Sequence, residues 1–164
     1  DIAVVTASPL ERAQETARPV AEMHGVPVGT DDDLIEAGNI FEGQTVGVGD
    51  GILKQPKLWR HLYNPFKPSW GEPYAEIAER MQRAVDRARE QARGREAFLV
   101  SHQSPIWIMR LGLENRRFVH DPRSRQCSLA SITSLMYDDD HLSAIVYTEP
   151  CADLVARSSK GFGA

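Results

Sequence analysis

Residues 2–17, IAVVTASPLERAQETA, decide the fold, because a strand and a helix adjoin there without a linker. The opening run of β-branched residues is typical of a buried strand. Ser8-Pro9 ends this run and marks a helix start, since serine caps helices and proline fits their first turn. The sequence therefore predicts a strand that passes directly into a helix.

The predicted helix covers residues 9–24, where apolar residues recur every three or four positions until Gly25. Ser8 and Glu11 form a capping-box pattern at its start. Residues 26–28 are expected to form a brief edge strand.

A longer amphipathic helix is predicted over residues 73–93, where Glu76 and Glu79 are spaced to pair with Arg80 and Arg83. It ends at a glycine and leads back to a strand.

A second strand-to-helix junction follows. Residues 97–100 form another apolar strand, which enters a helix through Ser104-Pro105. Residues 132–137 and 142–147 are expected to form a β-hairpin.

Alternating strands and helices of this kind indicate an α/β fold. We expect one domain over residues 1–164, a three-layer α/β/α arrangement with a mostly parallel mixed sheet to which the hairpin adds an antiparallel member. Such sheets bind ligands at the carboxyl ends of their strands.

Composition favours a globular protein that binds a small molecule. The 164 residues are 41% hydrophobic and 26% charged, with a formal net charge of -4 that gives no general attraction to nucleic acid. Apolar runs are too short to span a bilayer. Cys127 and Cys151 could pair or be small apolar residues, and the histidines lack the spacing of metal ligands.

Arg12 and His102 occupy comparable positions after the two strand-to-helix junctions. Both should face one cleft, where an arginine fork and a helix N-terminus suit an oxyanion or a phosphate. Each has a simpler interpretation: Arg12 could pair with Glu11 or Glu15 on the helix surface, and His102 could be a structural histidine. The pairing of the two positions favours the phosphate site.

Three segments carry a family resemblance. Residues 8–17, SPLERAQETA, resemble the S-P-L-x-R-A-x-E-T-A signature of the histidine phosphatase superfamily, which includes the cofactor-dependent phosphoglycerate mutases. Residues 34–43 are similar to its L-x-E…E-G segment, and residues 100–106, VSHQSPI, to its V-S-H-G-x-x-I. Gln103 replaces the common glycine of the last motif and is expected to tune the site.

The resemblance implies a phosphoglycerate mutase-like fold and a phosphomonoester hydrolase that works through a phosphohistidine, without cofactor or metal. It makes Glu36 the general acid and lets Arg12, His102 and the Gln103 backbone N–H hold the phosphoryl oxygens. Without the flanking motif, Glu36 would be one more acid after the acidic stretch at residues 31–33.

The family's R-H-G motif, which carries the nucleophilic histidine, has no counterpart in these residues. We expect it upstream of Asp1, so that the chain is a fragment lacking the first strand. In the family's sheet order this strand would lie between the strand at residues 98–100 and the hairpin strand at residues 132–137. Residues 1–164 alone are then expected to be poorly folded and inactive.

Two alternatives remain open: a phosphoglycerate mutase-type phosphoryl transfer, and a non-catalytic module that binds a phosphate ligand or a protein on the same fold. The aromatic and basic stretch at residues 58–70, within a long excursion from residue 31 that is partly helical near residues 57–62, could select the substrate or pack as surface loops. We expect a small phosphorylated substrate, no nucleic acid or membrane partner, a possible homodimer and a cytoplasmic location.

Overall fold

A computed structural model describes residues 1–37, 72–120 and 124–157. The chain divides into two compact units, residues 1–119 and 120–164. The expectation of a single domain stays a prediction.

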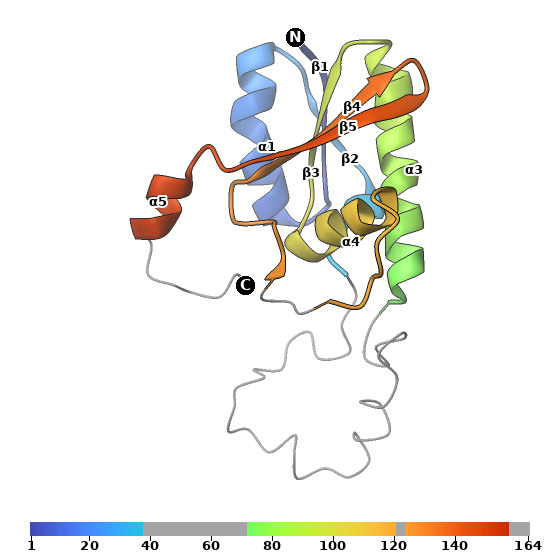
Figure 1. Cartoon of the computed structure of the whole chain (residues 1–164). Coiled ribbons are helices and arrows are strands. Elements are labelled where there is room, and N and C mark those ends of the chain that lie inside the picture. Colours follow the sequence, from blue (N-terminus) through green and yellow to red (C-terminus); the bar gives the residue numbers. More distant parts are fainter. Residues whose placement is uncertain (38–71, 121–123, 158–164) are drawn as a thin grey trace. The chain divides into compact units, whose positions relative to one another are not determined.

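The helices and strands follow the alternation that the sequence indicates (Figure 1). The excursion at residues 38–70, with its expected helix and its aromatic stretch, lies outside the described residues. In chain order the elements are β1 (Ile2–Ala7), α1 (Glu11–His24), β2 (Val28–Thr30), the 3-10 helix η1 (Asp32–Leu34), α3 (Tyr74–Ala92), β3 (Glu96–Val100), α4 (Gln103–Leu113), β4 (Ile132–Asp138), β5 (His141–Thr148) and α5 (Ala152–Arg157).

The first unit contains a parallel sheet in the order β2-β1-β3. Ala7 at the end of β1 lies opposite both Thr30 of β2 and Val100 of β3, so all three strands finish at one edge. The predicted α/β class with a parallel sheet is confirmed.

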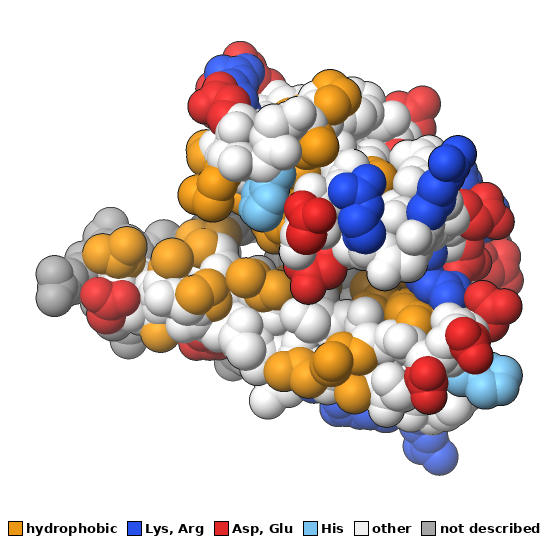
Figure 2. All heavy atoms as spheres, turned by 90° about the horizontal axis from the view of Figure 1, so that it is seen from above, with side chains coloured by type: hydrophobic (Ala, Val, Ile, Leu, Met, Phe, Trp, Pro, Cys, Tyr) orange, Lys and Arg blue, Asp and Glu red, His pale blue; other side chains and the backbone are white. Residues whose placement is uncertain are grey.

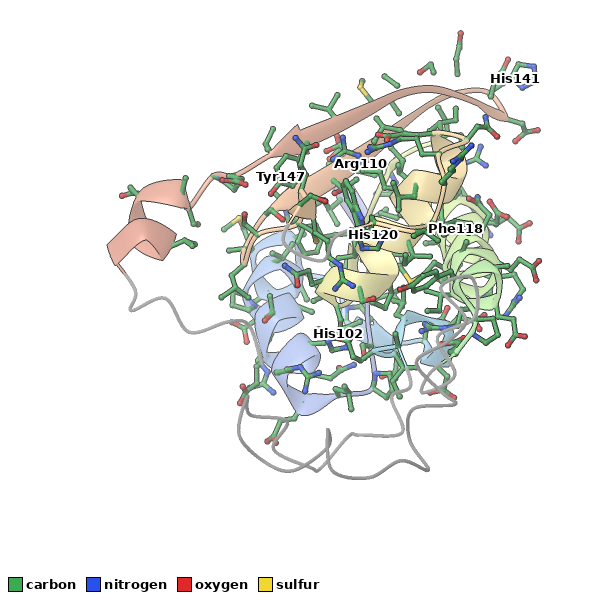
Figure 3. All side chains as sticks on the ribbon, turned by 60° about the horizontal axis from the view of Figure 1, so that its bottom comes forward. His102, Arg110, Phe118, His120, His141 and Tyr147 are labelled. Carbon is green, nitrogen blue, oxygen red and sulfur yellow. The ribbon has the colours of Figure 1, made fainter. Side chains whose placement is uncertain are left out.

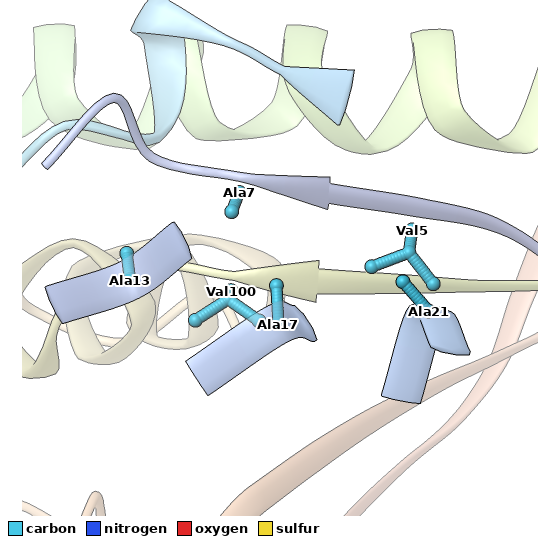
Figure 4. Close-up of a cluster of buried hydrophobic side chains, with 6 residues drawn as sticks. All are labelled: Val5, Ala7, Ala13, Ala17, Ala21 and Val100. Atoms are coloured by element: carbon cyan, nitrogen blue, oxygen red, sulfur yellow. The ribbon is translucent and has the colours of Figure 1, made fainter. Parts of the chain in front are cut away.

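Helices cover both faces of this sheet, with α1 on one side and α3 on the other (Figure 1). Alanines spaced four apart on α1 let its axis lie close to the strands, and they pack on valine and alanine side chains of β1 and β3. Figure 4 shows this core of small residues: Val5, Ala7, Ala13, Ala17, Ala21 and Val100.

Helix α3 confirms the predicted amphipathic helix to within a residue at each end. The ion pairs expected on its surface are wrong, however. Arg80 binds Glu72 at 2.8 Å and Arg83 binds Asp33 at 2.9 Å, because tertiary partners outcompete the exposed neighbours on the helix.

Two helix starts differ from the sequence prediction. Helix α1 begins at Glu11, with Leu10 as N-cap and no side-chain cap hydrogen bond. Helix α4 begins at Gln103, one residue before the expected Ser104. The first difference arises because the hydroxyl of Ser8 contacts His102 instead of capping the helix. The short strand β2 also lies two residues later than expected.

The second unit contains the predicted hairpin, in which β4 and β5 pair antiparallel with a register shift between Met136 and Tyr137. Within the described residues the hairpin forms a sheet of its own, and β3 pairs with β1 alone. The strand expected between β3 and the hairpin stays a prediction.

Several large apolar side chains are exposed, among them Met136 and Val146 on the hairpin. Figure 2 shows hydrophobic side chains at the surface beside charged ones. Within the described ranges, no helix has both the length and the apolar character needed to cross a membrane. Cys127 and Cys151 form no disulfide with each other.

Candidate active site

The candidate site lies at the edge where the three parallel strands end. Ser8 follows β1, and its N–H donates to the carbonyl of Val100 at the end of β3 at 2.9 Å. Asp31 follows β2, and its N–H donates to the carbonyl of Ala7 at 3.1 Å. These bonds hold the first residues beyond each strand side by side, where parallel sheets present ligand-binding groups.

His102 is the central side chain of this edge. It is 8% exposed, and its Nε2 lies 2.8 Å from the hydroxyl of Ser8, while its Nδ1 lies 3.3 Å from the guanidinium NH2 of Arg12. Figure 3 shows it beside the start of α1. Because a guanidinium only donates, Nδ1 accepts from Arg12, and the ring proton resides on Nε2 and is donated to Ser8.

The surroundings of His102 disfavour its charged form. Burial, followed by the positive charges of Arg12 and Arg80, lowers the pKa of His102 from 6.5 to about 4. The imidazole is therefore neutral at neutral pH. The positive charge near this site comes from Arg12 and Arg80 and not from His102.

Glu36 completes the cluster from the loop after η1. Its Oε2 lies 3.6 Å from Nδ1 of His102, and its Oε1 accepts a hydrogen bond from the N–H of Ala37 at 3.0 Å. The structure thus brings together Arg12, His102 and Glu36, the three side chains that the sequence singled out.

Gln103, the remaining predicted residue, lies at the first position of α4 with an exposed side chain. Its backbone belongs to the first turn of that helix, whose N–H groups favour anions. The expected phosphate-binding role of this N–H stays a prediction.

Sequence reasoning missed two neighbours of Glu36. Arg80 donates from α3 to the carbonyls of Asp33 and Ile35, and Ser101 donates to the carbonyl of Leu34. The sequence held a signal for Arg80, because this residue interrupts the apolar face of the predicted helix. The structure buries Arg80, which is only 6% exposed, as is rare for an arginine without partners.

The acidic stretch at residues 31–33 is separate from this cluster. It lines a polar groove along α3, where Arg87 pairs with Asp31 at 2.8 Å and with Asp33 at 2.6 Å. Burial raises the pKa of Asp33, but Arg83 and Arg87 outweigh it and hold that pKa below its usual value. The carboxylates of Asp31 and Asp33 are thus engaged by Arg83 and Arg87 of α3.

The other described histidines belong to other parts of the chain. His24 ends α1, His120 accepts from Arg125 at 2.9 Å, and His141 begins β5 at the hairpin turn. His61 falls outside the described residues. Across residues 1–37, 72–120 and 124–157, no group of three or more histidine, cysteine or acidic residues could hold a metal ion.

The chemistry of the cluster formed by Arg12, His102 and Glu36 suits a phosphoryl group. It offers a guanidinium fork, an imidazole and a helix N-terminus for oxygens, and a carboxyl group nearby that can exchange a proton.

Comparison with protein families points the same way. The family model described as histidine phosphatase superfamily (branch 1) matches residues 1–149. The chain is also 57% identical over 152 residues to the uncharacterized protein Rv0525 of Mycobacterium tuberculosis strain H37Rv, covering 93% of this chain and 75% of that protein.

Solved structures share the fold. The chain is similar to Bacillus stearothermophilus YhfR, with a TM-score of 0.59 and 20% identity over 73% of this chain and 60% of that one. It is similar to the alpha-ribazole phosphatase of Shigella flexneri, with a TM-score of 0.56 and 24% identity over 72% of this chain and 59% of that one. It is also similar to the mycobacterial glucosyl-3-phosphoglycerate phosphatase Rv2419c, solved with inorganic phosphate. The TM-score is 0.55, with 22% identity over 73% of this chain and 62% of that one. The chain thus spans about three fifths of the length of these solved chains.

Proposed function

Since this chain belongs to the histidine phosphatase superfamily, we propose that the full-length protein hydrolyses a small phosphomonoester through a phosphohistidine. One observation supports this above others: Arg12, His102 and Glu36 meet at the carboxyl edge of the parallel sheet.

In the proposed reaction an imidazole nitrogen attacks phosphorus, and the bond to the leaving oxygen breaks. Glu36 in its protonated form gives that oxygen its proton, so the alcohol leaves neutral. Water then attacks the phosphohistidine, the N–P bond breaks, and the Glu36 carboxylate takes the proton of the water. The products are an alcohol and inorganic phosphate, and Glu36 ends protonated as it began.

The nucleophile in this proposal is a histidine of the R-H-G segment that the family resemblance predicts upstream of Asp1. His102 is assigned to the phosphoryl oxygens, because its Nε2 is turned to Ser8 while its Nδ1 faces Arg12 and Glu36. The greater length of the similar Rv0525 is compatible with a further segment.

Arg12 and His102 would share the charge of the phosphoryl group. The Arg12 guanidinium can turn its N–H groups from Nδ1 of His102 to the oxygens of the ester. Nδ1 needs a proton to donate to such an oxygen, and a dianion beside it favours that protonation. Phosphate binding should therefore be coupled to proton uptake by His102.

A small phosphorylated molecule is the proposed substrate class. The proteins of similar fold include phosphatases whose names give glucosyl-3-phosphoglycerate and alpha-ribazole compounds as their substrates. The net charge of -4 agrees with a local anion site rather than a broad basic surface for nucleic acid.

The test is a panel of phosphomonoesters assayed with the full-length protein, together with rapid acid-free quenching to trap labelled phosphoenzyme. We expect turnover, a phosphoryl adduct that is stable in alkali and labile in acid, and a fall in kcat of roughly 100-fold or more in His102→Ala. Phosphate binding without turnover or adduct would instead support a non-catalytic binding module.

A further inference from the structure

Three consecutive backbone carbonyls lead to Glu36, and each accepts a hydrogen bond from a side chain. Arg80 NH1 donates to the carbonyl of Asp33 at 2.6 Å and to that of Ile35 at 2.8 Å. The hydroxyl of Ser101 donates to the carbonyl of Leu34 between them at 2.8 Å. The backbone that presents Glu36 is therefore held from two directions.

Arg80 itself is fixed by a second set of contacts. Its Nε and NH2 donate to the two carboxylate oxygens of Glu72 at 2.8 and 2.9 Å, a bidentate pair. The guanidinium is buried, and burial of a charge is tolerated only where its donors are satisfied. Nε and NH2 of Arg80 thus face Glu72, and NH1 faces the backbone that leads to Glu36.

The same two side chains connect the loop to His102. Ser101 directly precedes His102 in the chain, so its bond to Leu34 joins the Glu36 loop to the end of β3. The charge of Arg80 also acts on the imidazole of His102 and disfavours its protonation. Leu34, which lies between the two residues whose carbonyls accept from Arg80, is fully buried.

We propose that Arg80 is a positioning residue, which holds the Glu36 carboxyl beside His102 through the carbonyls of Asp33 and Ile35. This inference rests on the proposed function, in which Glu36 is the proton donor. Arg80 contacts neither substrate nor the reacting atoms in this assignment, and it acts through the geometry of Glu36.

Lysine cannot reproduce these contacts, although it keeps the charge. Its ammonium is one point on a flexible stem, whereas the planar fork of Arg80 reaches a carboxylate and two carbonyls at once. Arg80→Lys should therefore loosen the Glu36 loop while leaving the charge near His102 in place.

The experiment compares Arg80→Lys with the wild-type full-length protein on two substrates. p-Nitrophenyl phosphate has a good leaving group that needs little protonation, and phenyl phosphate has a poor one that needs more. We expect kcat/KM on phenyl phosphate, which reports on the formation of the phosphohistidine, to fall roughly 10- to 100-fold, the scale of a misplaced catalytic group, with a much smaller fall on p-nitrophenyl phosphate.

A double-mutant cycle with Glu36→Gln gives the second readout. If Arg80 acts through Glu36, then adding Arg80→Lys to Glu36→Gln costs little further activity on phenyl phosphate. Arg83→Lys is the matched control, because Arg83 lies one turn away on α3, is exposed and binds the Asp33 carboxylate rather than the loop carbonyls. It should leave both activities unchanged.

Ser101→Ala keeps the test decisive if Arg80→Lys does not fold, since it removes the bond to the Leu34 carbonyl together with a weak contact to the sulfur of Met81. It should show the same larger loss on the substrate with the poor leaving group. Equal losses of kcat/KM on both substrates, or full additivity with Glu36→Gln, would overturn the positioning role. No turnover by the wild-type protein would reject the proposed function instead, together with the inference that rests on it.

Discussion

His102 Nδ1 lies 3.3 Å from the guanidinium NH2 of Arg12, although 90 positions separate the two residues in the chain. The contact exists because β1 and β3 are parallel neighbours that end together, so the residues following each strand meet at one edge. An arginine donor directed at a neutral ring nitrogen can be redirected to a stronger acceptor, which a phosphoryl oxygen provides.

The first prediction concerns anion binding by Arg12. Arg12→Lys should weaken the binding of inorganic phosphate about 10- to 100-fold, because a lysine cannot offer the bidentate fork that arginine gives to phosphate. Isothermal titration of the full-length protein measures this. Arg18→Lys, on the same helix and exposed, is the control and should bind phosphate as the wild type does. Equal affinities for all three proteins would exclude Arg12 from the site.

A second prediction follows from the lowered pKa of His102. The folded protein holds this pKa near 4, against 6.5 for an ordinary histidine, so the unfolded chain takes up the proton first as the pH falls. The contribution of the neutral His102 ring to the free energy of unfolding is complete above pH 6.5. It is lost as the pH drops toward 4, by roughly 3 kcal/mol at most.

Urea unfolding of the wild type and of His102→Gln, at several pH values without phosphate, measures that contribution. The wild type should lose more unfolding free energy between pH 7 and pH 4.5 than the variant, which lacks the titrating ring. Parallel curves for the two proteins would show that the pKa of His102 is not depressed in the folded state.

The third prediction distinguishes Glu36 from Glu42, the other acid of the L-x-E…E-G segment. Glu36→Gln should lower kcat/KM on phenyl phosphate far more than on p-nitrophenyl phosphate, because in the step that forms the phosphohistidine only the poor leaving group requires a proton. Glu42 lies outside the described residues. Steady-state kcat/KM values for Glu36→Gln and Glu42→Gln test the assignment, which fails if Glu42→Gln shows the stronger dependence on the leaving group.

The arrangement of Arg12 and His102 could be predicted from the sequence because it follows from topology. Two apolar strands that each pass into a helix belong to a parallel sheet, and such strands end at the same edge. Glu36 was different, since nothing in its spacing separates it from the acidic stretch at residues 31–33. Only the resemblance of its flanking motif singled it out.

Local patterns misled where tertiary contacts were stronger. Ser8 has the spacing of a capping box with Glu11, yet its hydroxyl lies against His102. Arg80 is placed for a helical pair with Glu76, yet it binds Glu72 and the loop before Glu36. In both cases a buried polar group gained partners that are distant in sequence, and capping or pairing rules consider near neighbours alone.

The last prediction concerns Ser8, which is fully buried and accepts the Nε2 proton of His102 at 2.8 Å. Ser8→Ala removes that acceptor, and a buried donor left unsatisfied costs about 1–3 kcal/mol. Unfolding free energies should fall by this amount, and nitrogen NMR of labelled histidine should show His102 moving from the Nε2–H form toward the Nδ1–H form. Ser143→Ala is the control, because Ser143 is exposed and donates to the carbonyl of Met136, so its loss should change stability by less than about 0.5 kcal/mol. A wild-type ring that carries its proton on Nδ1, or equal losses in the two serine variants, would contradict the role assigned to Ser8.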